Sequence, residues 1–152
     1  MNLNDLQPKE VFRYFYEICR IPHGSYNIDA ISDYLVAFAK ERNLEVVQDE
    51  LKNVIIKKPA TEGYEKEETL ILQGHMDMVA VKDAESDIDL EKESLRLNFK
   101  DGCLYAEGTS LGGDDGIAIA YALAILDSDT IKHPALEVVI TVNEEVGMDG
   151  AI

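Results

Sequence analysis

The spacing of apolar residues predicts two amphipathic helices at the start of the chain. The first begins near Pro8 and should end before Pro22, because its apolar residues recur at helical spacing and proline is tolerated in a first turn. Its stripe consists of Val11, Phe12, Phe15, Ile18 and Cys19. The second covers about 28–42, with a stripe of Ile28, Ile31, Leu35, Phe38 and Ala39. We interpret both stripes as core positions.

Short apolar runs predict the strands. Segments 45–48 and 53–57 are expected to form a hairpin, and 95–99 and 103–106 flank an Asp101-Gly102 turn. The runs 69–72 and 136–142 show no alternation, which indicates strands buried on both faces. A helix over 117–126 lies between them and predicts a parallel crossover. The expected fold is α/β, with a mixed, largely parallel central sheet flanked by helices.

Composition narrows the class of partner. The 152 residues suit one globular domain, and the net charge of -16, from 14 basic and 30 acidic residues, excludes nucleic acid and an anionic membrane surface but permits cations. Cys19 and Cys103 are far apart and predict free thiols in a reducing compartment. The N-terminus lacks a basic region followed by an apolar run, and 117–126 is too short to span a bilayer of ~30 Å. The predicted location is the cytoplasm.

Candidate chemistry follows the two apolar strands. Gly74 ends the first strand before His75 and Asp77, and the second strand is followed by Glu144 and Glu145. Asp114 and Asp115 lie in a glycine-rich turn that opens the 117–126 helix. Ligands bind at the carboxyl ends of strands in open α/β sheets. We therefore expect five side chains to converge there, namely His75, Asp77, Asp114, Glu144 and Glu145. Helix capping and chance clustering of surface acids are the alternatives. The turn lacks the lysine of a phosphate-binding loop.

Histidine with carboxylates and no thiolate suits zinc, manganese or cobalt. Adjacent Glu144 and Glu145 cannot both point the same way from an extended chain, so one carboxylate would bind a metal and the other would act as a general base. Two metals sharing a carboxylate would lie ~3.5–4 Å apart. His23 and His133 are expected to be surface residues rather than ligands. The acidic segment 82–93 is expected to be a solvated loop, because Ile88 holds the position that an EF-hand gives to glycine.

The candidate residues lie in three motifs, which are Gln73-Gly-His-Met-Asp-Met-Val79, Leu111-Gly-Gly-Asp-Asp-Gly-Ile117 and Asn143-Glu-Glu-Val-Gly-Met148. These motifs resemble those of the co-catalytic zinc exopeptidases, and among these the aminoacyl-histidine (Xaa-His) dipeptidases. The resemblance implies two-metal hydrolysis of dipeptides, with zinc as the preferred ion. It also implies roles for these residues. His75 would bind one zinc and Asp77 would orient His75, while Asp114 would bridge both metals with Asp115 as a neighbour. Glu144 would be the general base, and Glu145 would bind the other zinc.

Members of that family are longer than this chain. They carry a second aspartate and a second histidine ligand and an inserted domain for substrate binding and dimerisation. We therefore expect 1–152 to be the N-terminal portion of a metallopeptidase catalytic domain, without the lid/dimerisation domain and the C-terminal part, and the full-length form to be a homodimer. The segment alone should bind metal weakly, be inactive, and self-associate through an exposed sheet edge. The alternatives are an aminoacylase- or tripeptidase-like amide hydrolase, and a non-catalytic acidic domain for assembly or cation binding.

Overall fold

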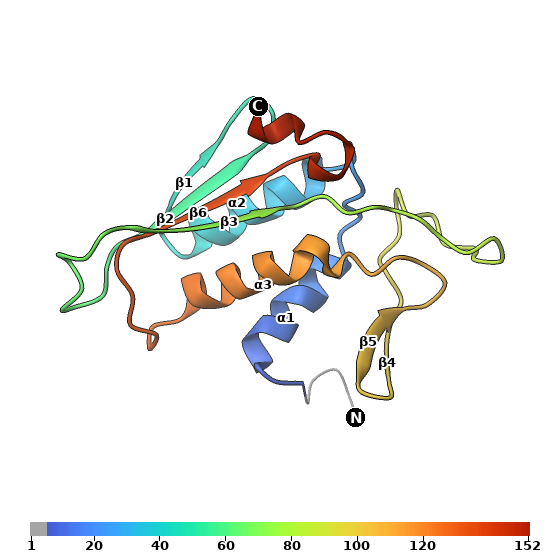
Figure 1. Ribbon diagram of the computed structural model, residues 1–152, viewed down its shortest axis with the longest axis horizontal. Helices are drawn as coiled ribbons and strands as arrows, with labels where there is room; N and C mark the ends of the chain where they lie inside the picture. Colours follow the sequence, from blue (N-terminus) through green and yellow to red (C-terminus); the bar gives the residue numbers. More distant parts are fainter. Residues whose placement is uncertain (1–5) are drawn as a thin grey trace.

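The computed structural model describes residues 6–152, so residues 1–5, considered above for a leader, lie outside the described part. Its centre is a four-stranded sheet of order β1-β2-β6-β3, formed by β1 (Glu45–Gln48), β2 (Val54–Lys58), β6 (Leu136–Thr141) and β3 (Leu70–His75). The helices are α1 (Lys9–Cys19), α2 (Asp29–Glu41) and α3 (Gly113–Asp127). Figure 1 shows α1 and α3 side by side, with β3 and β6 running in the same direction above α3.

The sheet is mixed, as predicted, but it is less parallel than expected. Only β3 and β6 pair in parallel within the described residues, whereas β1–β2 and β2–β6 are antiparallel. The short connection between β1 and β2 allows only an antiparallel hairpin. Within this hairpin, β2 pairs antiparallel with β6 on the side that β3 does not occupy. The α/β class is confirmed, and "largely parallel" is wrong for this sheet.

The core lies between the helices and one face of the sheet. Alternate residues of the strands point into it, so that Ile56 pairs with Val138 in one row and Val54 with Ile140 in the next, all four at most 1% exposed. These residues belong to one buried cluster with side chains of all three helices. The opposite face carries Val47, which is 50% exposed. The hairpin predicted from 45–48 and 53–57 is confirmed, since β1 and β2 pair antiparallel.

The burial on both faces that was expected for the strand at 69–72 is wrong. Leu70 is 48% exposed and Ile71 is 61% exposed, although these consecutive residues point to opposite faces of the sheet. In the described chain β3 is an edge strand. Burial begins only where the strand ends, at Gly74 and His75. An open apolar edge agrees with the premise of self-association, which stays a prediction.

An ion-pair network ties the three helices together. Asp127, at the end of α3, accepts bonds from Arg42 Nε at 2.6 Å and Arg13 Nη2 at 2.9 Å. Arg42 also donates to the hydroxyl of Tyr14 at 3.1 Å and stacks on Phe38. Burial alone would raise the pKa of Asp127, but hydrogen bonds with Tyr14 and Arg42 and the charges of the two arginines lower it.

The remaining elements lie away from the main sheet. The hairpin of β4 (Leu97–Lys100) and β5 (Cys103–Ala106) stands apart from the other strands (Figure 1) and confirms the predicted turn. The acidic segment 82–93 is mostly exposed, and fully buried Ile88 anchors it. Over the range 6–152, no helix is both long enough and apolar enough to cross a bilayer.

Candidate metal centre

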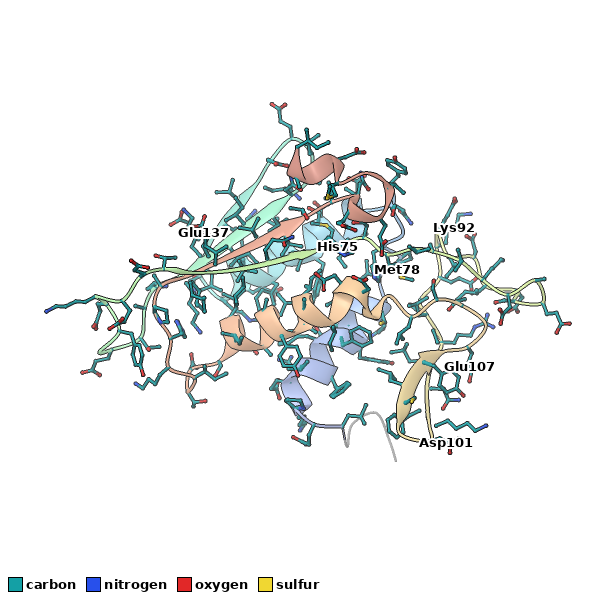
Figure 2. The ribbon with its side chains drawn as sticks, in the orientation of Figure 1. His75, Met78, Lys92, Asp101, Glu107 and Glu137 are labelled. Carbon is teal, nitrogen blue, oxygen red and sulfur yellow. The ribbon has the colours of Figure 1, made fainter. Side chains whose placement is uncertain are left out.

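His75 is held in place where β3 ends. Its backbone N–H donates to Asp115 Oδ2 at 3.2 Å, and its ring Nδ1 lies 3.0 Å from the carbonyl oxygen of Asp77. A carbonyl oxygen only accepts, so Nδ1 carries the proton and Nε2 is the free ligand atom of the neutral ring. The side chain is 9% exposed. Figure 2 shows His75 and Met78 together at the end of this strand, above the start of α3.

The start of α3 delivers the aspartate pair. Gly112 has φ +69°, and a side chain there would place Cβ 2.7 Å from Met78 Sδ, so the turn requires glycine. Beyond it, Asp114 Oδ1 lies 3.2 Å from His75 Nε2 and its side chain is 87% exposed. Asp115 lies behind the strand end and accepts the His75 backbone N–H. One aspartate faces the histidine ligand atom, and the other supports its backbone.

The end of β6 delivers the glutamates. Because β3 and β6 are parallel and in register, Thr141 pairs with His75, and the residues after Thr141 reach the same edge. Glu144 and Glu145 begin the 3-10 helix η2 (Glu144–Val146). Their backbone N–H groups donate to the Asp77 carboxylate, Glu144 to Oδ1 at 2.9 Å and Glu145 to Oδ2 at 3.4 Å. Asp77 therefore joins the ends of the two strands.

Three side chains meet at one point. One ligand atom each from His75, Asp114 and Glu145 lie within 4.8 Å of one another, and Glu144 Oε2 is 3.9 Å from His75 Nε2. Among the described residues, no lysine or arginine forms an ion pair with these carboxylates. Carboxylates clustered around an imidazole, with no lysine or arginine to balance their charge, suit a divalent metal ion. The residues present therefore fit such an ion.

The pKa values of the centre reflect this crowding. Burial, followed by the charges of Asp114 and other nearby carboxylates, raises the pKa of Glu145. Burial is also the main cause of the raised pKa of Asp115. For His75, burial opposes the charged ring, but the bond to the Asp77 carbonyl and the surrounding carboxylates outweigh it and raise the pKa. The site is therefore electronegative and would stabilise a bound cation.

All five residues proposed from the sequence are in this region. His75, Asp77, Asp114, Glu144 and Glu145 come from three separate segments and meet at one edge of the sheet. Their individual roles stay predictions.

Sequence reasoning missed two supporting residues, Ser25 and Asp115. Ser25 Oγ donates to Asp77 Oδ2 at 2.7 Å, and Asp115 anchors the backbone of His75. Ser25 ends the Ile21-Pro-His-Gly-Ser25 loop, but no local pattern gives it a role, because its partner lies 52 residues away. Asp115 had been treated only as a neighbour of Asp114.

The expectation that His23 and His133 lie on the surface is wrong. They are 3% and 4% exposed, and each satisfies Nδ1 with a nearby carbonyl, Ile21 O at 2.6 Å and Pro134 O at 2.7 Å. Burial lowers the pKa of His23 despite its bond to Ile21 and the charge of Asp77. Neither histidine belongs to the group of ligand atoms around His75.

Fold and site together define an α/β domain with a cluster of histidine and carboxylate side chains, able to hold a cation, at the ends of two parallel strands. The sequence profile of peptidase family M20/M25/M40 matches residues 71–152, and the chain belongs to this family. That match contains all five residues of the centre.

Individual relatives support the assignment. The chain is 40% identical over 149 residues to the cytosol non-specific dipeptidase of Escherichia coli. The aligned residues make up 98% of this chain and 31% of that protein. The crystal structure of aminoacylhistidine dipeptidase from Vibrio alginolyticus has a TM-score of 0.96 at 39% identity, over 99% of this chain and 31% of the other. A tripeptidase from Staphylococcus aureus has a TM-score of 0.72 at 26% identity, over 91% of this chain and 37% of the other. The chain therefore spans about a third of the length of these relatives.

Proposed function

We propose that this chain forms part of a metal-dependent peptidase that hydrolyses dipeptides, in particular those of the Xaa-His type. The observation that carries the proposal is the meeting of His75 Nε2, Asp114 and Glu145 within 4.8 Å, with Glu144 beside them. Family membership and the two dipeptidase relatives support the peptide substrate. The negative charge of the chain supports the absence of nucleic-acid partners.

In this proposal two divalent ions, with zinc preferred over manganese or cobalt, are held by His75, Asp114 and Glu145. Asp114 would be the shared ligand, since its side chain is 87% exposed and lies beside His75 Nε2. When bound, the ions would polarise the scissile carbonyl and acidify water. The Asp77 carbonyl keeps the proton on His75 Nδ1, and the Asp77 carboxylate fixes the backbone of both glutamates.

Glu144 is the proposed general base. Its side chain is 40% exposed and ends 3.9 Å from His75 Nε2, so it reaches the centre and remains open to water and substrate. A carboxylate in that position can take a proton from water and give it to the amine nitrogen that leaves. Glu145 shares the turn and donates its backbone N–H to the other oxygen of Asp77. The two glutamates would thus divide ligation and proton transfer.

We further propose that residues 1–152 are the N-terminal portion of the catalytic domain of a cytoplasmic, homodimeric enzyme, with the lid/dimerisation domain and the remaining ligands encoded elsewhere. The share of about a third of the relatives' length supports this. If two ions bind, each has one residue of its own and shares Asp114, which is fewer ligands than the three usual in catalytic zinc sites. The chain alone should then bind metal weakly and lack turnover.

Zinc titration by calorimetry tests the centre. The chain should bind zinc weakly and lose that binding in His75→Ala, while Asp89→Asn in the acidic loop serves as the control and should bind as the parent does. Equal binding by parent and His75→Ala would contradict the proposed centre. Nanomolar affinity together with dipeptide hydrolysis by the chain alone would contradict the incomplete site.

Turnover by the protein at the full length of its relatives tests the reaction. Glu144→Gln should abolish hydrolysis while zinc binding persists. The tripeptidase likeness gives a specific reason to include tripeptides, and an N-acyl amino acid completes the substrate panel. Preference for a tripeptide or an N-acyl substrate would assign the alternative tripeptidase- or aminoacylase-like function.

A further inference from the structure

Asp77 is a buried charge with an unusual set of partners. Its side chain is 0% exposed, and no lysine or arginine pairs with it anywhere in the stretch 6–152. A buried carboxylate must be compensated by hydrogen bonds. Its donors are the backbone N–H groups of Glu144 and Glu145 and the hydroxyl of Ser25. The Ser25 bond, at 2.7 Å, is the shortest of the three.

Ser25 comes from the loop between α1 and α2, which is joined to the centre at several points. Gly24 forms a parallel bridge with Met78, and the Ser25 N–H donates to the Met78 carbonyl at 3.2 Å. The N–H of Tyr26 donates to Asn143 Oδ1 at 2.8 Å. The loop therefore contacts both segments that carry the centre, the one after β3 and the one after β6.

We propose that Ser25 is a positioning residue of this centre: its hydroxyl fixes the Asp77 carboxylate, and Asp77 in turn fixes the turn that carries Glu144 and Glu145. Oδ2 of Asp77 has two donors, Ser25 at 2.7 Å and the Glu145 N–H at 3.4 Å. Without the hydroxyl, Oδ2 retains only the longer bond. The carboxylate can then rotate, and the glutamates lose their common anchor.

This inference rests on the proposed function for its purpose, but its geometry can be tested without metal. Amide hydrogen exchange measured by NMR on the 152-residue chain reports the two N–H bonds to Asp77 directly. Ser25→Ala should make the Glu144 and Glu145 amides exchange faster, on the order of tenfold, while the amides in the middle of β6 keep their rates. Ser25→Thr retains a hydroxyl and should restore slow exchange.

A matched control comes from the same loop. Asn27 donates from Nδ2 to the carbonyl of Glu91 at 3.0 Å, a contact that does not reach Asp77. Asn27→Ala should leave the Glu144 and Glu145 amides unchanged. If Ser25→Ala does not fold, Ser25→Cys keeps the size with a weaker donor and should give an intermediate rate. Unchanged exchange at both glutamates in a folded Ser25→Ala or Ser25→Cys variant would overturn the proposal.

Zinc affinity then connects the positioning to the centre. For the full-length enzyme, Ser25→Ala should lower zinc affinity roughly 10- to 100-fold, as is typical when a residue that supports the metal ligands is changed. Faster amide exchange together with no zinc binding by the parent protein would support Ser25 as the anchor of Asp77 and contradict the proposed function. If the Glu144 and Glu145 amides of Ser25→Ala exchange at the parent rate while zinc binding depends on His75, the proposed function is supported and the role of Ser25 is contradicted.

Discussion

Gly74 offers a test of the support behind His75 that alters none of the proposed ligands. An alanine there would place Cβ 2.7 Å from Asp115 Oδ2, a separation that real Cβ atoms do not sustain, and 3.6 Å from the Ala118 methyl group, which is ordinary contact. The Asp115 carboxylate must therefore move away. It then loses its bond with the His75 N–H, which is 3.2 Å long.

The cost can be worked out from that single bond. A hydrogen bond to a charged group contributes about 1.5–3 kcal/mol. Replacing glycine by alanine also stabilises the folded state by about 0.4–1 kcal/mol through the entropy of the unfolded chain. Gly113→Ala shares this second effect but not the first, because its nearest atom, Leu111 Cδ2, is 3.9 Å away. Gly74→Ala should therefore be less stable than Gly113→Ala by about 1.5–3 kcal/mol.

Urea unfolding followed by circular dichroism measures this difference. The cause can be isolated in an Asp115→Ala background, where the obstructing carboxylate is gone and Gly74→Ala should cost almost nothing. If Gly74→Ala is as stable as Gly113→Ala in the parent chain, the bond between Asp115 and the His75 N–H does not stabilise the fold. If Gly74→Ala still lowers the unfolding free energy without Asp115, the new methyl group clashes with another residue.

Two further predictions concern the helical layer. Asp127→Asn should lower the free energy of unfolding by about 1–3 kcal/mol at neutral pH, while Glu10→Gln, which removes an exposed ion pair, should change it by less than about 0.5 kcal/mol. Because the folded state lowers the pKa of Asp127, its contribution is present above the ordinary carboxyl pKa and lost as pH falls through the lowered value. In urea titrations, the difference in unfolding free energy between the parent and Asp127→Asn should therefore shrink in acid. A difference that does not change with pH would contradict the proposed role of the Asp127 charge. Burial raises the pKa of Cys19 to about 12, whereas Cys103 is exposed. Iodoacetamide at pH 8 should alkylate Cys103 and spare Cys19 until the chain unfolds, as mass spectrometry can check; equal rates would contradict this packing.

The sequence predicted those parts of the fold that local patterns determine. Helical spacing located α1 and α2, and the Asp101-Gly102 turn located the β4–β5 hairpin. The rule that ligands collect at strand ends predicted that His75 and Glu145 lie close together, although they are 70 positions apart in sequence. They do so because the parallel pairing of β3 and β6 places Thr141 beside His75.

The remaining features depend on neighbours that lie far away in the sequence. The apolar run at Leu70 and Ile71 looks buried, but strand order alone decides whether it is central or at an edge. Likewise His133 is buried in a segment whose backbone bonds to Thr61, 72 residues away. The same reasoning explains why Ser25 escaped notice. A serine in a loop has no distinguishing pattern until its partner is known.

The separations within the centre have a thermodynamic consequence. His75 and Asp114 are 39 positions apart, and Asp114 and Glu145 are 31 apart, so no short peptide contains the ligand set. The unfolded chain would have to close long loops before these atoms could meet, which disfavours cation binding to it. A cation that binds the folded state alone raises the unfolding free energy by about 2.7 kcal/mol at a concentration of 100 times its Kd. The thermal midpoint of this chain should therefore rise with the logarithm of zinc concentration, and that slope would report the affinity of the centre.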